Sequence, residues 1–305
     1  MNTMIETPYL EMQVEICGCC ALQCKHCSSF PIRHIKDICY DFTCLTSFAS
    51  HIYGKKCINI TGGEPLHCNN LHNYLTLLKS VPDLSIGLFS SGIMLKDGVL
   101  QCVSKDYADF LFAEGISSVS LSIYHTTGDI HDKFTGVHGA LQLTLASIEN
   151  FLSAGIRVSI HVVINQYNLQ CLDDIIADLD KLNLSEIRLL KIAKSGNAIN
   201  NWNDIGVEKF VPNKAMRKIH HLNTSSSALS IAGFPDLVAC RRFEGAIKCQ
   251  AGINLLYITT SGLVFPCASF RNRPSHCVGS ISDPASLCNH MATINSTYYE
   301  HCLAG

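Results

Sequence analysis

The sequence lacks any uninterrupted apolar run of about 18 residues, the length that a membrane-spanning helix needs. It also lacks a basic segment followed by an apolar core near its N-terminus, where Glu6 and Glu11 stand instead. No signal peptide is therefore expected, and the cytoplasm is the predicted location. Charge is scarce too, because 16% of the residues are charged and the formal net charge is −2. This balance predicts neither a nucleic acid nor a membrane surface as partner.

What the sequence does contain is apolar and periodic. Hydrophobic residues make up 47% of the 305 residues, enough to bury one full α/β domain with a small appendage. Apolar, β-branched runs recur at 13–17, 57–60, 84–89, 118–123, 157–164 and 186–191, and helical periodicity follows the first five at 40–53, 71–78, 107–112, 140–152 and 172–182. This alternation predicts right-handed βαβ units and a parallel sheet. We predict an α/β fold, a partial (β/α)6 TIM-like barrel, with an open doubly wound sheet as the alternative.

The pattern changes near residue 200. Residues 197–212 are polar and rich in asparagine, which indicates a linker, and a short helix (213–222) and a serine-rich loop (224–227) are expected after it. From about residue 231, short strand-like runs replace the βαβ period. We therefore predict a barrel over 1–200, a linker with a helix over 201–238, and a small cysteine-rich domain over 239–305.

Cysteine is abundant, with 17 residues. A reducing cytosol disfavours a disulfide framework, so clustered cysteines there indicate metal binding or redox chemistry. Cys20, Cys24 and Cys27 form a C-x3-C-x2-C loop after the first predicted strand. Three thiolates at such a spacing can hold a four-iron cluster and leave one iron open for another ligand. A structural zinc site, completed by a nearby histidine or cysteine, is the alternative.

A second motif ends the next predicted strand, which runs into Gly62-Gly63-Glu64-Pro65. Two glycines let a backbone approach a ligand closely, and the carboxylate that follows can accept hydrogen bonds from an ammonium group. The ends of parallel strands open on the same mouth of a barrel. We therefore expect this segment and the cysteine loop to line one site.

Together these motifs, with His26 just before the last cysteine, resemble the signature of the radical S-adenosylmethionine (SAM) superfamily. The resemblance continues at the predicted strand ends 90–92, 120–123, 164–168 and 196–198, although Ile123 or Tyr124 stands where the family has an aspartate. It implies a SAM-binding [4Fe–4S] cluster on Cys20, Cys24 and Cys27. It also implies a set of residues that contact SAM, namely His26, Gly62, Gly63, Glu64, Ser90, Ser122 and Asn165.

The C-terminal part carries a further pattern, in which Cys249, Gly262 and Cys267 fit C-x12-G-x4-C. This resembles the opening of the twitch and SPASM auxiliary-cluster domains. Residues 257–259 and 263–265 are predicted to form a hairpin that returns Cys267 towards Cys249. We predict a twitch-like domain with an auxiliary [4Fe–4S] cluster, and Cys288 and Cys302 compete for two places in the ligand set Cys240, Cys249, Cys267 and Cys277. A zinc ribbon is the alternative, although no C-x2-C pair follows Cys27.

The resemblance implies reductive cleavage of SAM to a 5′-deoxyadenosyl radical that takes a hydrogen atom from the substrate. A flavodoxin- or ferredoxin-like protein is the expected electron donor. Modification of a ribosomally made peptide, by epimerisation or crosslinking, is the favoured activity. Against it, no N-terminal peptide-recognition domain of the usual size is expected before the first strand. A radical dehydrogenase of a small molecule, such as a sugar alcohol or nucleotide, is the alternative, and a non-catalytic zinc-binding scaffold is the alternative of another class.

Overall fold

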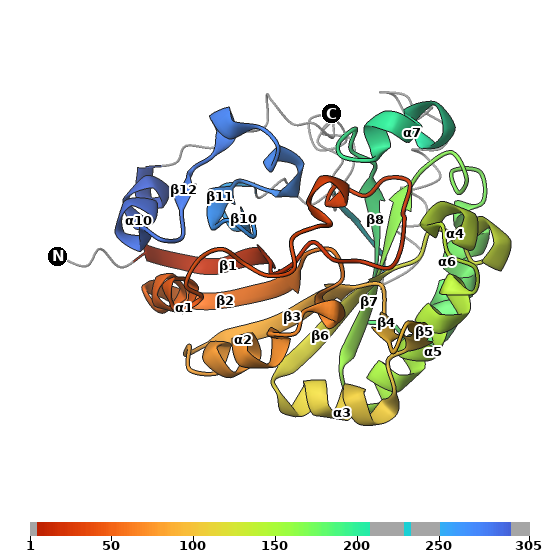
Figure 1. The fold of residues 1–305 in the computed structure, drawn as a ribbon, viewed down its shortest axis with the longest axis horizontal. Coiled ribbons are helices and arrows are strands. Elements are labelled where there is room, and N and C mark those ends of the chain that lie inside the picture. Colours follow the sequence, from red (N-terminus) through yellow and green to blue (C-terminus); the bar gives the residue numbers. More distant parts are fainter. Residues whose placement is uncertain (1–4, 208–228, 233–250, 294–305) are drawn as a thin grey trace.

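The computed structural model describes residues 5–207, 229–232 and 251–293. Its centre is one ten-stranded sheet in the order β12-β11-β10-β1-β2-β3-β6-β7-β8-β9. Figure 1 shows the strand direction turning from β1 to β8, so the sheet curves around its inner face. The strands are β1 (Ile5–Glu15), β2 (Ile52–Thr61), β3 (Leu84–Ser90), β6 (Ile116–Ser122), β7 (Arg157–Ile164), β8 (Glu186–Lys191), β9 (Leu229–Ala232), β10 (Leu255–Ile258), β11 (Leu263–Phe265) and β12 (Gly279–Ser280).

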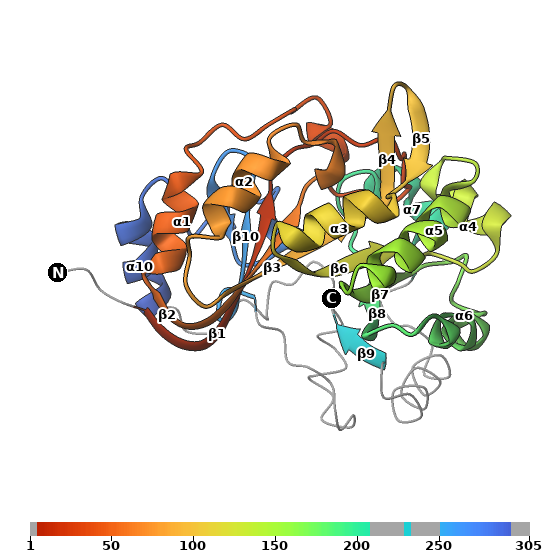
Figure 2. The same cartoon turned by 90° about the horizontal axis from the view of Figure 1, so that it is seen from below.

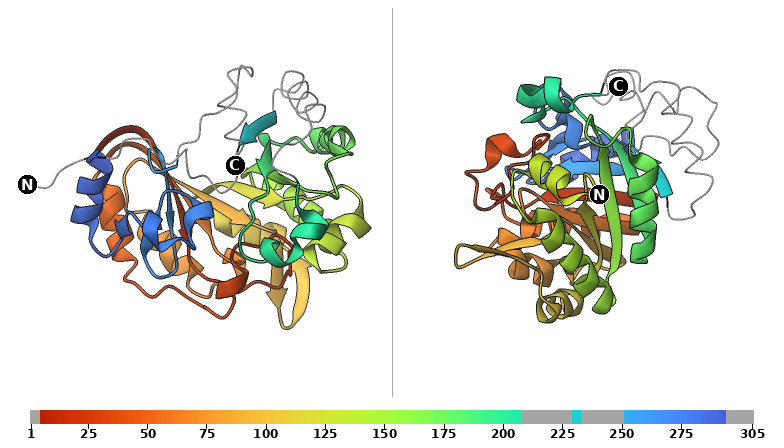
Figure 3. Two further views of the ribbon diagram at one scale, coloured as in Figure 1. Left: turned by 90° about the horizontal axis from the view of Figure 1, so that it is seen from above. Right: turned by 90° about the vertical axis from the view of Figure 1, so that its right-hand side faces the viewer.

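The six strands expected from the sequence are β1, β2, β3, β6, β7 and β8, and they pair in parallel in chain order. The prediction of a parallel sheet is thereby confirmed. Two further parallel strands extend it, since β9 pairs with β8 and β10 pairs with β1. Within the described residues, β12 and β9 form the two edges of the sheet without pairing to each other. The architecture is a partial barrel (Figure 3).

Helices cover the outer face of this sheet (Figures 1 and 2). They are α1 (Thr43–Ser50), α2 (Leu71–Leu78), α3 (Lys105–Ala113), α4 (Gly128–Thr135), α5 (Ala140–Ser153) and α6 (Leu172–Leu179). The first predicted helix was too long, because Ile52 and Tyr53 belong to β2. Ile52 is buried and pairs with Ile5 of β1, so strand pairing overrides the helical periodicity there. None of the helices described is long and apolar enough to cross a membrane.

Several elements differ from the sequence prediction. Helix α4 forms in a segment for which no helix was predicted. A hairpin of β4 (Ile93–Lys96) and β5 (Val99–Cys102) follows β3 and projects from the body (Figure 2). Its turn is Asp97-Gly98, in which both residues have positive φ, a common two-residue hairpin turn. The predicted linker is also wrong in its first part, because helix α7 (Ala198–Ile205) forms there and buries both of its end residues. The helix and loop predicted at 213–227 lie outside the described residues.

The C-terminal hairpin is confirmed: β10 and β11 pair antiparallel around Gly262. It continues the barrel sheet, because β10 lies parallel to β1 with Glu11 opposite Leu255. Helix α10 (Pro284–Thr293) follows β12 and packs beside α1 and β1. The predicted boundary near residue 238 lies outside the described residues, so the division into domains stays a prediction.

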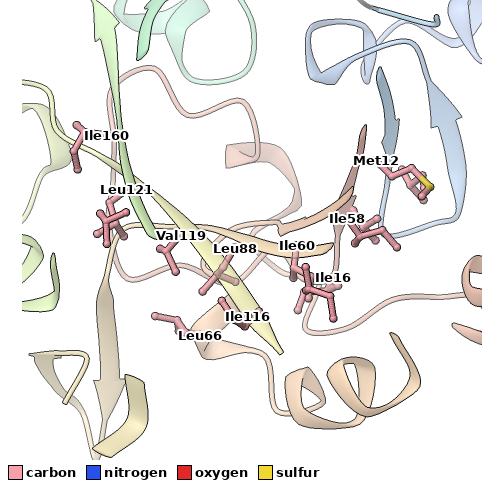
Figure 4. Packing of buried hydrophobic residues seen from close by; sticks show 14 of the residues in the cluster. Met12, Ile16, Ile58, Ile60, Leu66, Leu88, Ile116, Val119, Leu121 and Ile160 are labelled. Atoms are coloured by element: carbon pink, nitrogen blue, oxygen red, sulfur yellow. The ribbon is translucent and has the colours of Figure 1, made fainter. Parts of the chain in front are cut away.

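The core lies between the sheet and its helices. Alternate strand residues supply it, and Ile60, Leu88 and Val119 are fully buried partners on three neighbouring strands (Figure 4). Burying each such side chain stabilises the fold by about 1.5–3 kcal/mol. The intervening residues face the other way, into the barrel. They include many polar side chains, and these line the candidate site.

Candidate active site

The loop that carries Cys20, Cys24 and Cys27 joins β1 to a short 3-10 helix, η1 (Phe30–Ile32), and three barrel segments clamp its backbone. After β2, Gly63 N–H donates to the carbonyl of residue 17 at 2.7 Å. At the end of α4, two carbonyls accept loop N–H groups at 2.7 and 3.0 Å. At the start of α7, Asn197 donates from its backbone to Cys27 O at 2.9 Å and from its amide to Cys24 O at 3.1 Å. These contacts hold an irregular loop in one place.

The glycines of the Gly-Gly-Glu segment make room for this loop. A Cβ on Gly63 would stand 2.2 Å from Gly18 O and 2.3 Å from Cys19 O, and one on Gly62 would stand 2.3 Å from Cys17 O. The sequence reasoning expected these glycines to admit a ligand, whereas the close approach in the structure is to the cysteine loop. Both glycines also line the cavity described below. Their contact with SAM stays a prediction.

Glu64 connects the ends of two strands. Its carboxylate is buried and accepts four hydrogen bonds. One oxygen accepts from Leu66 N and Ser90 Oγ at 3.2 and 2.7 Å. The other accepts from Ser91 N and Ser91 Oγ at 2.7 and 2.6 Å. A carboxylate has about four acceptor sites, so these donors fill them. The structure thus gives Glu64 a positioning role that the sequence did not predict, and its contact with a SAM ammonium stays a prediction.

The sheet, the cysteine loop and the C-terminal hairpin enclose a cavity of about 800 Å³. This size suits a small-molecule or cofactor site. Nearly all of the site residues predicted for the barrel line it, namely Cys20, Cys24, Cys27, His26, Gly62, Gly63, Glu64, Ser90 and Ser122.

The three thiols of the loop line the same cavity and form no disulfide. Burial raises the pKa of Cys20 to about 12, with a further contribution from Glu64. Burial also raises the pKa of Cys24, and the charges of Cys27 and Cys20 add to the shift. A thiolate is therefore unfavourable here without added positive charge, which iron would supply.

The spacing of these thiols matters for the choice of metal. Among the described residues, no three His, Cys, Asp or Glu side chains form a group that could hold a single metal ion. A four-iron cluster binds each thiolate on a different iron, so its ligands lie farther apart. Three thiols that line one cavity are a donor set that fits such a cluster.

Asn165 does not line the cavity. It is fully buried in the turn after β7, where its amide donates to Val163 O at 2.8 Å and its side-chain oxygen accepts from Tyr167 N at 2.8 Å. These are local bonds of the kind that fix a turn. The structure therefore separates Asn165 from the other predicted contacts of SAM.

His26 packs within an aromatic group. Its ring centroid lies 5.0 Å from that of Tyr124 and 5.3 Å from that of Phe134. Burial lowers the pKa of His26 to about 4, so the imidazole is neutral near pH 7. This ring belongs to the cysteine loop itself, and its buried Nδ1 has no hydrogen-bond partner.

Sequence reasoning missed several residues that face the cavity. They include His161 on β7 and Arg188 on β8, which are register partners and form one row on the cavity wall with Ser122 of β6, a residue that the sequence did predict. Burial lowers the pKa of His161 to about 3, and no hydrogen-bond partner reaches its Nε2. A polar residue inside the apolar run of β7 was the available signal, since only the inner face of a barrel strand accommodates it. Arg33 also lines the cavity.

The cysteines predicted for the auxiliary site are only partly described. Cys267 lines the cavity, and with Cys277 it packs on a small cluster of Tyr257, Phe265 and Phe270. The other predicted ligands, Cys240 and Cys249, lie outside the described residues.

A buried charge network joins this hairpin to the cysteine loop. Arg271 Nη1 lies 2.6 Å from Glu15 Oε1, and its Nη2 lies 3.0 Å from Oε2. Tyr257 and Ser29 donate to Glu15 Oε1 at 3.0 and 3.2 Å, and Thr260 N–H donates to Oε2 at 3.4 Å. The two cysteine regions therefore share one brace across the sheet.

Comparison with known proteins finds relatives that match most of the length of this chain. The AdoMet-dependent heme synthase of Methanosarcina barkeri is 23% identical over 293 residues, covering 88% of this chain and 78% of that protein. Among solved structures, Streptococcus suis SuiB bound to its precursor peptide SuiA superposes with a TM-score of 0.68 at 13% identity. That match covers 98% of this chain and 66% of SuiB, slightly under two thirds of its length. Native anSMEcpe with bound AdoMet and the Cp18Cys peptide gives 0.64 at 15% identity, covering 96% and 87%.

The family itself follows from the sequence of the barrel. Residues 14–179 match the model of the Radical SAM superfamily. This segment contains the end of β1, the cysteine loop, the Gly-Gly-Glu segment and the strands β2, β3, β6 and β7. Because the match spans more than half of the chain, the protein belongs to the radical SAM superfamily.

Proposed function

We propose that this enzyme cleaves SAM at the Cys20, Cys24 and Cys27 loop and modifies a peptide substrate by hydrogen-atom abstraction. The observation that carries the proposal is the clamped loop, whose three thiols share one cavity with Gly62 to Glu64. Radical SAM enzymes use a [4Fe–4S] cluster and SAM. When bound, this pair supplies a 5′-deoxyadenosyl radical, a chemistry that belongs to the cofactor.

The chain's own residues would bind and shield these groups. Cys20, Cys24 and Cys27 would ligate the cluster and leave one iron open to SAM. The backbone at Gly62 and Gly63, with the hydroxyl of Ser122, would contact the methionine part of SAM. The aromatic wall at His26 would exclude water from the reacting centre, which prevents side reactions of a radical.

The far part of the cavity is the proposed substrate region. His161 and Arg188 face it with a neutral ring and a cation that is paired to Glu186 at 2.8 Å. A peptide is favoured because SuiB and anSMEcpe, which share the fold, hold peptides in their solved structures. A tetrapyrrole, as the name of the Methanosarcina barkeri relative indicates, is the competing substrate class.

The cluster site can be tested by removing its ligands together. The Cys20→Ala/Cys24→Ala/Cys27→Ala variant should lose one four-iron cluster and all reductive cleavage of SAM to 5′-deoxyadenosine. A matched triple variant at Cys39, Cys102 and Cys171, to alanine, should keep its iron and its activity. Undiminished 5′-deoxyadenosine formation by the first variant would remove the proposal.

The substrate class needs a separate test. Peptides encoded beside the gene, deuterated at their side chains and Cα positions, would be incubated with enzyme, SAM and a reductant under anaerobic conditions. Deuterium should appear in 5′-deoxyadenosine, and the peptide should change mass. Transfer from a tetrapyrrole and none from any such peptide would replace the peptide assignment.

We also propose the auxiliary cluster on Cys240, Cys249, Cys267 and Cys277. Cys267 on the cavity wall, with Cys277 beside it, supports this ligand set. Wild-type protein should carry about eight irons, for two four-iron clusters. Cys277→Ala should lose about half of the iron and still cleave SAM, whereas Cys288→Ala, which alters a buried thiol within α10, should keep all of its iron. The reverse result would assign the ligand to Cys288.

A further inference from the structure

Arg33 is a half-buried residue, and two nitrogen atoms of its guanidinium are buried without a hydrogen-bond partner. It follows η1, and its guanidinium carbon lies 4.8 Å from the ring centroid of Phe30. Its Nε and Nη2 atoms are buried and have no hydrogen-bond partner. These two N–H groups form one edge of the guanidinium fork. A buried charge whose donors are unmet is costly, so this edge is expected to meet a negative group in the working enzyme.

The negative charges around Arg33 point to the cysteine loop. The backbone at Arg33 packs against the start of this loop, since a Cβ on Gly18 would stand 3.2 Å from Arg33 N, and Arg33 lines the same cavity as Cys20 and Cys24. Two carboxylates line the same cavity: Glu64 already accepts four hydrogen bonds, and Glu11 accepts two from neighbouring amides. Among the described residues, no carboxylate forms an ion pair with Arg33. The loop's own thiolates are therefore the best-placed acceptors.

We infer that Arg33 sets the reduction potential of the SAM-binding cluster by placing its charge and its free N–H edge against the cluster's sulfur atoms. The inference rests on the proposed function, because it requires a cluster on Cys20 and Cys24. One-electron reduction by an external reductant makes the cluster more negative, and a fixed positive charge stabilises that state. Hydrogen bonds to sulfur act in the same direction, because they also stabilise added negative charge. Arg33 therefore makes the cluster easier to reduce.

The test is a potentiometric titration followed by electron paramagnetic resonance, on anaerobically reconstituted full-length protein without SAM. Arg33→Met should show a more negative midpoint potential than wild type. We expect the equilibrium constant for reduction to fall at least tenfold, which is about 59 mV for one electron. Arg33→Lys should lie between them, since it keeps the charge and loses the planar fork. The matched control is Lys96→Met, which removes an exposed cation from the β4–β5 hairpin and should leave the potential unchanged.

The outcomes are distinguishable. A wild type with no reducible cluster on the loop defeats the proposed function itself. Normal iron content in Arg33→Met with the wild-type potential overturns the inference alone, and weaker SAM binding by that variant would then assign Arg33 to the SAM carboxylate. If Arg33→Met does not take up iron, Arg33→Gln decides, because its amide keeps hydrogen-bond donors while removing the charge. An unchanged potential in Arg33→Gln overturns the inference as well.

Discussion

Replacing Arg271 by methionine would leave the Glu15 carboxylate buried without its cation. Glu15 is fully buried, and Arg271 is 9% exposed. Removing one partner of a buried ion pair typically costs about 3–5 kcal/mol. Three donors from Tyr257, Ser29 and Thr260 would still reach the carboxylate. These hydrogen bonds still offset part of the cost of burying the Glu15 carboxylate. We therefore expect Arg271→Met to lower the free energy of unfolding by about 3 kcal/mol, the lower end of that range.

A second variant separates charge from packing. Glu15→Gln/Arg271→Met removes both charges and keeps a hydrogen-bonding group at position 15. The double variant should therefore be more stable than Arg271→Met alone, with a coupling energy of about 2 kcal/mol, within the range for residues in one ion-pair network. The measurement is reversible urea unfolding under anaerobic conditions, followed by far-ultraviolet circular dichroism.

The pH dependence gives an independent check. Burial raises the pKa of Glu15, and the Arg271 charge is the largest cause that opposes this rise. Without Arg271, the pKa should rise further. A carboxyl with a raised folded-state pKa contributes stability that is present below its unfolded pKa and is lost as the pH climbs through the folded value. Arg271→Met should therefore recover stability, relative to wild type, as the pH is lowered from 8 towards 5.5. A stability loss below about 1 kcal/mol, or a loss of equal size at both pH values, would refute this account of the brace.

Three further predictions concern single residues of the site. Gly63→Ala should reduce the iron and sulfide bound after reconstitution, because its Cβ would meet the backbone of the cysteine loop at 2.2 Å, whereas Gly128→Ala, with nothing within 4 Å, should bind the wild-type amounts. Asn165→Ala should lower the melting temperature and leave the SAM dissociation constant unchanged, while Ser122→Ala should weaken SAM binding; the opposite pattern would restore Asn165 as a SAM contact. His161→Phe should slow substrate modification without changing SAM affinity, and since burial holds the pKa of His161 near 3, the wild-type rate should show no titration of this group between pH 6 and 9.

Much of the barrel could be predicted because its signals are local. Alternation of β-branched runs with 3.6-residue periodicity identified six strands and five helices, and the hairpin around Gly262 was found from its turn residues. The elements that were missed depend on distant contacts. Helix α7 is polar in sequence, yet its start is fixed by Asn197 holding the cysteine loop. Ile52 joins a strand because β1 lies beside it.

The same distinction applies to the site. The cysteine spacing and the Gly-Gly-Glu segment could be recognised from the sequence, because each is a short contiguous motif whose residue types suit a known chemistry. The actual neighbours of Gly63 and the buried edge of Arg33 depend on how the loop folds over the barrel mouth. No periodicity in the chain encodes such a contact. Asn165 shows the converse case, in which a strand-end asparagine serves its own turn.

The parallel pairing of β10 with β1 has a consequence for how the protein is made. Glu11 lies opposite Leu255, so about 240 residues separate the two partners in the chain. At about 5–20 residues per second, β1 leaves the ribosome some 10 to 50 seconds before the strand that covers it. Until then β1 exposes an unpaired edge, which is open to pairing with other chains. Until Arg271 has been synthesised, Glu15 has no cation with which to pair. The C-terminal residues that line the cavity with Cys20, Cys24 and Cys27 are also absent until then. Iron loading of the first site should therefore come after synthesis, once the last hairpin has closed on the sheet.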